Sequence, residues 1–191
     1  MVLLALFMMG IASAEVGAVM EPADVVEQYR NYAKSKKVSD DGATLRCRGV
    51  VEELQLCATI ISDKGWRYAT MADSEPGMPA TVGKHGFVEA DADGVGRYWV
   101  RALNDGKEGL FFHSPELFKA VSTGPLVVAW PKAGVVIAWT PGNPMLDKVV
   151  SVGVARMVDV ADHAVSPLIF IHNDQEWMVW GEAKKAEVPA P

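Results

Sequence analysis

The chain has 191 residues and a mass of 20.6 kDa, which fits one domain of ordinary size or two small ones. Half of the residues are hydrophobic and 22% are charged, so the composition excludes intrinsic disorder over the whole length. The formal net charge of −6 argues against general nucleic-acid binding, which depends on clustered lysines and arginines.

Residues 2–14 form an uncharged apolar segment that ends in Ala12-Ser13-Ala14. The segment suits the apolar region of a secretory signal and is too short to span a bilayer, which takes about 20 residues. We predict a signal peptide over residues 1–14, cleaved after Ala14, with a second candidate site after Ala18. A buried N-terminal strand or helix is the alternative. With this signal, the protein is expected to be soluble and either secreted or periplasmic.

The next segment has one predicted helix and three predicted strands. Apolar residues at helical spacing predict an amphipathic helix over about 23–36. Two apolar-rich runs, 44–51 and 54–61, predict a hairpin, and residues 66–71 predict a third strand.

The two cysteines, Cys47 and Cys57, lie on the two arms of this hairpin. A three-residue turn centred on Glu52 places them opposite each other, at a separation that a disulfide can bridge. Export would bring them into an oxidising compartment, where an even number of cysteines favours a bond. We therefore predict a Cys47–Cys57 disulfide. Two buried free thiols are the alternative, and a lone cysteine pair lacks the further ligands of a zinc site.

Residues 73–96 hold Pro76, Pro79 and five glycines, and they lack sustained periodicity. This composition predicts a long loop, or two short irregular strands around 86–88, and loops of such length are often functional. Residues 98–103 and 110–112 are expected to be strands. Ser114-Pro115 is typical of a helix start and predicts a short helix over about 115–121.

The C-terminal part begins with two buried apolar runs, 125–131 and 135–140, which predict a second hairpin. Asn143-Pro144 then predicts the start of a helix over about 144–160, in which Gly153 is expected to allow close packing on the sheet. Residues 168–172 and 177–180 predict a closing hairpin, and the tail 184–191 is expected to be disordered.

The order of these elements predicts the fold class. Strands are grouped around separate helices without strict βαβ alternation, which favours an α+β fold: a mostly antiparallel sheet with about three helices packed on it. We expect one α+β domain over residues 15–183, with sub-units at 22–72 and 110–183 on either side of the 73–96 loop.

The segment from Ser114 to Trp180 resembles the C-terminal part of the YtpQ-like family, bacterial proteins of unknown function. The residues that carry the resemblance are SPELFKAVSTGPLVVAWPKAGVVIAWT, the valine-rich helix after it, and AVSPLIFIHNDQEW. The resemblance covers roughly a third of the chain. It implies a helix, a strand that ends at Pro131, a second strand, a helix and a closing hairpin. It implies no catalytic residue.

The run from Glu89 to Gly94 sets acidic residues at positions 1, 3 and 5 and glycine at position 6, as an EF-hand loop does. Position 12 is Val100, where an EF-hand has a glutamate, and the flanking helices are missing. Glu89, Asp91 and Asp93 are therefore candidate binding residues of a calcium or small-molecule module that uses the 73–96 loop. A solvated acidic turn is the alternative.

Asp162, His163 and Ser166 supply the residue types of a hydrolase triad within one short loop. A triad is defined by geometry, however, and three residues so close in sequence rarely achieve it. The chain also lacks the GxSxG nucleophile motif and the glycine-rich phosphate loops. A small exported hydrolase remains an alternative function, but no residue is predicted to be catalytic.

The chain has six tryptophans, which is many for its length. Trp177 and Trp180 lie three apart on the last predicted strand and therefore face opposite sides, so one side can present an exposed aromatic ring to a partner. Core packing is the alternative. We predict a non-catalytic binding or interaction protein of the cell envelope, without a cofactor or bound metal, whose partner is an unknown protein or envelope component.

Overall fold

The computed structural model describes residues 15–73, 86–173 and 176–184. The predicted signal peptide, residues 74–85 of the predicted loop and nearly all of the tail lie outside the described residues. The elements are β1 (Glu15–Pro22), α1 (Ala23–Ser35), α2 (Asp40–Ala43), β2 (Cys47–Val51), β3 (Leu54–Ser62), β4 (Gly65–Tyr68), β5 (Val88–Asp91), β6 (Arg97–Ala102), α3 (Leu110–His113), the 3-10 helix η1 (Pro115–Ala120), β7 (Val127–Ala129), β8 (Val135–Trp139), α4 (Pro144–Val160), β9 (Leu168–His172) and β10 (Trp177–Glu182).

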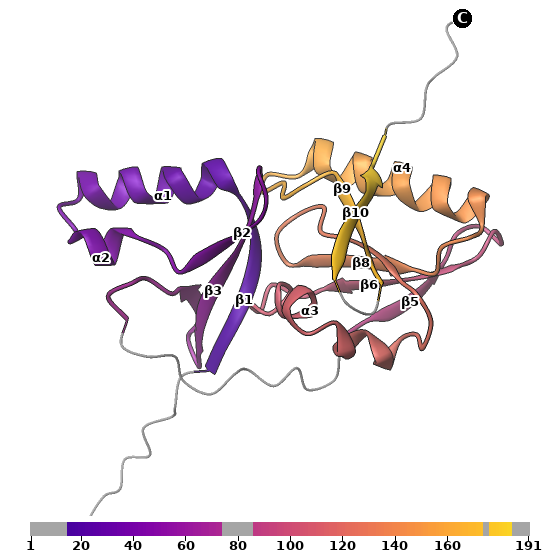
Figure 1. The fold of residues 1–191 in the computed structure, drawn as a ribbon, viewed down its shortest axis with the longest axis horizontal. Coiled ribbons are helices and arrows are strands. Elements are labelled where there is room, and N and C mark those ends of the chain that lie inside the picture. The colour runs from indigo at the N-terminus through magenta and orange to yellow at the C-terminus, as the bar shows by residue number, and fades with distance from the viewer. Residues whose placement is uncertain (1–14, 74–85, 174–175, 185–191) are drawn as a thin grey trace, which may run out of the picture.

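Strands β1 to β4 form the first sheet, with β3 at its centre (Figure 1). Strand β1 pairs antiparallel with one edge of β3 along its whole length. Strands β2 and β4 share the other edge of β3 and follow each other along it. Val19 and Met20 are neighbours on β1 and point to opposite faces, yet both are buried, so each face of this sheet is covered at β1.

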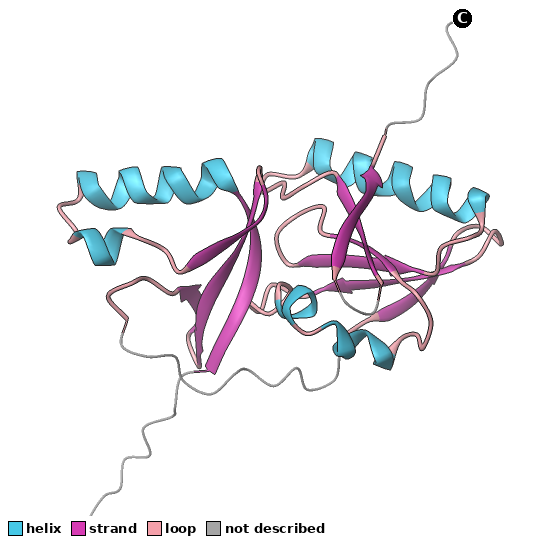
Figure 2. Cartoon of the chain, in the orientation of Figure 1, coloured by secondary structure: helices cyan, strands magenta, loops and turns pink. Residues whose placement is uncertain are grey.

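The second sheet has six strands in the order β10-β9-β7-β8-β6-β5, and every pair of neighbours is antiparallel. Figure 2 shows these strands in magenta, with helices in cyan on both sides of them. Helix α4 packs on one face, where Val150 and Val154 contact Ile137 of β8 and its neighbours. The other face carries α3 and η1 over Val136 and Ala138. Successive residues of β8 therefore pack into apolar clusters on opposite faces of the sheet, as expected for a strand that is buried on both sides.

The two sheets share one apolar core. Met20 and Leu56 of the first sheet belong to the same cluster as Phe111, Trp130 and Phe170 of the second part of the chain. Helix α3 lies between the sheets in Figure 1 and contributes Phe111 to this cluster. Because burial of apolar surface is the dominant favourable term in folding, each sheet stabilises the other.

The antiparallel α+β architecture confirms the predicted fold class in its broad form. The strands lie in two sheets rather than one, and among the described helices only α1 and α4 exceed six residues. The helix predicted over 115–121 is the 3-10 helix η1. In the described part of the chain, no helix combines the length and apolar character needed to cross a membrane.

The Cys47–Cys57 disulfide is confirmed: the two residues are directly opposite in the β2–β3 pairing, with their Cα atoms 4.0 Å apart. The turn that aligns them differs from the prediction. Glu52 and Glu53 form a two-residue turn, because Val51 pairs with Leu54. A bulge in β2 between Gly49 and Val51 adds one residue and restores the register that the longer turn would have given.

Two sequence-based expectations are wrong. Residues 110–112 were expected in a strand but belong to helix α3. Ser114 N–H, just after the helix, donates to the Leu110 carbonyl. Phe111 is completely buried there, so packing between the sheets overrides the strand preference of aromatic residues. Gly153 does not allow close packing on the sheet: it lines a pocket beside the Asp91–Asp93 turn, and a Cβ there would meet nothing within 4 Å.

Gly17 on β1 lies where the backbone around Gly106 packs closely against the first sheet. A Cβ at this position would fall inside van der Waals contact of the Gly106 carbonyl oxygen and 2.7 Å from Thr59 Oγ1. We expect Gly17→Ala to lower the free energy of unfolding by about 1–3 kcal/mol, because overpacking forces the backbone apart. Urea unfolding of the purified variant measures this.

Gly49→Ala is the matched control, since β2 leaves open space around a Cβ at that position. Its unfolding midpoint is expected to equal that of the wild type within error. Equal midpoints for the Gly17 and Gly49 variants would contradict the close approach of the two sheets.

Candidate functional site

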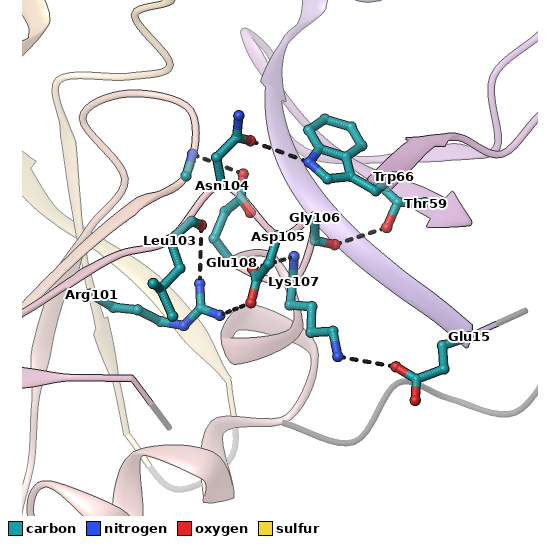
Figure 3. Close-up of polar contacts among 11 residues, drawn as sticks. Glu15, Thr59, Trp66, Arg101, Leu103, Asn104, Asp105, Gly106, Lys107 and Glu108 are labelled. Atoms are coloured by element: carbon teal, nitrogen blue, oxygen red, sulfur yellow. Dashed lines mark hydrogen bonds and ion pairs between the residues drawn. The ribbon is translucent and has the colours of Figure 1, made fainter. Parts of the chain in front are cut away.

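The segment from Asn104 to Gly109 joins the two sheets through polar contacts (Figure 3). Trp66 Nε1 donates to Asn104 Oδ1 at 3.2 Å, and Thr59 Oγ1 donates to the Gly106 carbonyl at 2.8 Å. Lys107 Nζ lies 3.0 Å from Glu15 Oε2, and Gly109 N–H donates to the Ala18 carbonyl at 2.7 Å. We call residues 104–109 the junction loop.

A buried arginine anchors the junction loop to β6. The side chain of Arg101 is 1% exposed, and its Nη2 lies 2.5 Å from Asp105 Oδ2 (Figure 3). The guanidinium carbon is 5.4 Å from the ring centroid of Phe111, within the range of a cation–π contact. A buried charge must be paired to be tolerated, so this arrangement fixes the position of Asp105 and of the loop that follows it.

Glu108 of the junction loop is buried almost completely, with 2% of its surface exposed. Its Oε1 accepts a hydrogen bond from Gly134 N–H at 3.1 Å, and its carbonyl accepts one from Trp130 Nε1. Within the described residues, Oε2 has no hydrogen-bond partner. Burial raises the pKa of Glu108 to about 7, although its hydrogen bonds and the nearby Arg101 act in the opposite direction.

Glu21 at the end of β1 is a second buried carboxyl. Burial raises its pKa, and the hydrogen bond from the Tyr68 hydroxyl, at 2.5 Å, opposes that shift, as does the nearby His163. Burial and the contact with Glu21 raise the pKa of Tyr68. Perturbed pKa values often mark functional sites, but structural groups show them too. Because Glu21 and Glu108 are both buried and their hydrogen bonds are to neighbouring strands and loops, we assign both a structural role.

The 162–166 loop does not assemble a triad. Asp162 and His163 are exposed, whereas Ser166 is buried. Ser166 Oγ accepts a hydrogen bond from Leu168 N–H at 3.0 Å, which fixes the entry into β9. Among the described residues, no hydrogen bond joins Ser166 to His163. The structure therefore gives no support to a nucleophilic serine here.

The candidate acidic residues form the tip of the β5–β6 hairpin. Asp91 Oδ1 accepts a hydrogen bond from Gly94 N–H, and Glu89 pairs with Arg97 across the strands at 3.0 Å. Asp93 adopts a left-handed backbone conformation with φ of 53°. The described residues contain no group of three or more His, Cys, Asp or Glu side chains that could hold a metal. The observed contacts are those of a hairpin turn.

Trp177 and Trp180 do point to opposite sides of β10. Trp177 stacks on Phe112 with ring centroids 5.0 Å apart, and its Nε1 donates to the Phe112 carbonyl at 2.7 Å. Trp180 lies on the other side of β10, where its ring centroid is 6.3 Å from that of Trp139, and 43% of its surface is exposed. Trp177 is therefore part of the aromatic core, and Trp180 is the exposed aromatic residue of the pair.

Strand β10 is an edge strand of the second sheet, where it pairs only with β9 among the described strands. Three consecutive residues of β10 are exposed and apolar: Met178 at 42%, Val179 at 48% and Trp180 at 43%. A pocket of about 320 Å³ adjoins the first residue of the strand and includes Phe118, Leu126, His172 and Trp177 in its wall. We call the exposed edge of β10, with this pocket, the β10 edge.

Comparisons with protein-family models, with curated proteins and with solved structures found no match to this chain. The resemblance of residues 114–180 to the YtpQ-like family therefore stays a prediction.

Sequence reasoning missed Glu108, Arg101 and the full extent of the β10 edge. Asn104-Asp105-Gly106 has the composition of a surface turn, and nothing in it indicates that the residues around it would be buried between two sheets. Met178 and Val179 belong to an apolar run that predicts a strand, but an apolar run alone does not distinguish a buried strand from an exposed edge.

Proposed function

We propose that the protein is a non-catalytic binding protein of the cell envelope that binds an extended segment of a protein partner along the β10 edge. The observation that carries this proposal is the row Met178-Val179-Trp180, exposed and apolar on an edge strand. An edge strand of this kind is a template for a strand from another chain, because backbone hydrogen bonds give affinity and alternate side chains give specificity.

The backbone of β10 offers groups for such pairing. Asn173 N–H donates to the Glu176 carbonyl at the hairpin turn, and from there hydrogen-bonded and non-hydrogen-bonded pairs alternate as far as Val179, where a bulge shifts the register before Gly181. Met178 is therefore hydrogen-bonded to its partner on β9, whereas the N–H and carbonyl groups of Trp177 and Val179 point away from β9. A partner strand would pair with these two residues, next to the pocket at Trp177.

Export is part of this proposal, and the disulfide supports it. A disulfide is typical of proteins that fold in oxidising compartments. Cleavage after Ala14 would keep all the described residues of β1, Glu15–Pro22, in the mature chain. Cleavage after Ala18 would remove the first half of β1, including four residues paired with β3. The fold therefore favours Ala14 of the two predicted cleavage sites.

Val179→Pro tests the binding mode. Proline removes the outward N–H of Val179 and places a ring on the free edge, while the hydrogen bonds to β9 remain. We expect the affinity for the partner to fall about tenfold or more, since a backbone hydrogen bond and close approach are both lost. The partner is isolated from envelope extract, its contact with residues 177–182 is mapped by cross-linking, and its affinity for each variant is then measured.

Val88→Pro is the matched control, because Val88 is also exposed and begins β5, the strand at the opposite edge of the same sheet. Its affinity for the partner is expected to match that of the wild type, and Trp180→Ala is expected to weaken binding. A partner that cross-links elsewhere, or that binds the Val179 variant as tightly as the wild type, would refute the proposed docking strand.

A further inference from the structure

The first sheet has an open groove on the face toward α3. Ala18 and Ala58 lie directly opposite each other on β1 and β3. Their small side chains form the floor of the groove. The groove has a volume of about 750 Å³. Its apolar lining includes Val16, Leu56 and Leu110 as well as the two alanines. This volume is within the range of small-molecule sites, which are about 300–1,000 Å³.

Two arginines form one rim of the groove. Arg48 is paired with Leu56 across β2 and β3, and the Arg46 carbonyl accepts a hydrogen bond from Ala58 N–H. Each arginine therefore lies beside a residue that lines the groove. Residues in register on neighbouring strands share a face. Arg48 Nη2 lies 3.4 Å from His113 Nδ1, which closes the groove on the α3 side.

The charges of these two arginines are not neutralised within the described part of the chain. Arg46 donates to the backbone carbonyls of Thr70 and Asp73, at 2.8 and 2.5 Å, which fixes its side chain without supplying a negative charge. None of the described ion pairs involves Arg46 or Arg48. Arg67, on β4, contrasts with them, because both carboxylate oxygens of Asp73 bind it.

We propose that this groove binds a fatty acid, with the acyl chain on the Ala18–Ala58 floor and the carboxylate on the guanidinium groups of Arg46 and Arg48. Guanidinium groups bind carboxylates through two parallel hydrogen bonds, and the apolar floor gains from covering by a hydrocarbon chain. An inorganic anion would make no contact with the apolar lining, and a neutral amphiphile would leave the arginines without a counter-charge. This ligand site is on the first sheet and is independent of the β10 edge.

The test uses dodecanoate below its micelle concentration, with dodecanol and inorganic phosphate as comparison probes. Isothermal titration calorimetry on the purified wild type is expected to give saturable one-to-one binding of dodecanoate. Arg48→Ala and Ala58→Leu are expected to weaken that binding about tenfold or more, because the first removes a charge-assisted contact and the second fills the floor. Dodecanol is expected to bind at least tenfold more weakly than dodecanoate.

Arg156→Ala is the matched control, since Arg156 is an exposed arginine of α4 on the other sheet. Its affinity for dodecanoate is expected to equal that of the wild type. Thermal unfolding of each variant confirms that it is folded before binding is measured. No binding of dodecanoate, equal binding by the Arg48 and Ala58 variants, equal binding of dodecanol, or binding of phosphate with the same affinity would each overturn the proposal.

Discussion

Replacing Glu108 with glutamine is expected to stabilise the protein at pH 8 and to change its stability little at pH 5. The pKa of Glu108 is about 7 in the folded protein, against 4.5 for an unperturbed glutamate. At a pH between these two pKa values, Glu108 is ionised in the unfolded chain and still protonated in the folded protein. The free energy of unfolding of the wild type therefore falls as the pH rises through this window, by about 3 kcal/mol in total.

Glutamine removes this dependence because it stays neutral, and its side-chain oxygen still accepts the hydrogen bond from Gly134 N–H. Urea unfolding at pH 5, 6.5 and 8 measures the effect, with Glu116→Gln on the exposed side of η1 as the control. The gap between Glu108→Gln and wild type should widen with pH, and the control should follow the wild type. Parallel curves for wild type and Glu108→Gln would show that Glu108 titrates as a solvated carboxyl.

Breaking the Cys47–Cys57 disulfide is expected to lower the free energy of unfolding by about 3 kcal/mol, from the entropy that a short closed loop removes from the unfolded chain. Strand β2 depends on this bond in particular. It is short, carries a bulge and ends in a two-residue turn of glutamates, and it lies at an edge of β3. Reduction should therefore loosen β2 before the centre of the sheet.

The measurement compares urea midpoints of the wild type with and without reductant, next to the Cys47→Ala/Cys57→Ala double variant. The reduced wild type and the double variant are expected to unfold at similar urea concentrations, both below the oxidised wild type. Reductant should have no effect on the double variant. An unchanged midpoint for the reduced wild type would mean that packing around the buried Cys57 holds β2 without the bond.

Helix α4 shows what local sequence can predict. Its limits, Pro144 and Val160, match those expected from the cap and the periodicity, and Asn143 Oδ1 accepts hydrogen bonds from the backbone N–H groups of Met145 and Leu146. The hairpins β2–β3 and β7–β8 were predictable for the same reason, since turn residues and apolar runs lie within one short segment. The disulfide followed from the register of such a hairpin.

Strand β1 and helix α3 show where local sequence is insufficient. Residues 15–22 have no alternating pattern, because neighbouring residues such as Val19 and Met20 are buried on opposite faces. Residues 110–112 have strand-like composition but fold into α3 between the sheets. In both cases the decisive contacts come from segments distant in the chain: β3 pairs with β1, and Phe111 packs against Phe87 and belongs to one cluster with Met20 and Leu56.

The candidate sites divide in the same way. Local patterns were enough to predict the α+β class, the cysteine pair and the opposite orientation of Trp177 and Trp180, because these depend on the period and register of single elements. Two features emerged only from the fold: Glu108 is buried with no partner for Oε2 among the described residues, and β10 is an edge strand of the described sheet. Burial and strand order are set by long-range packing, which no local pattern encodes.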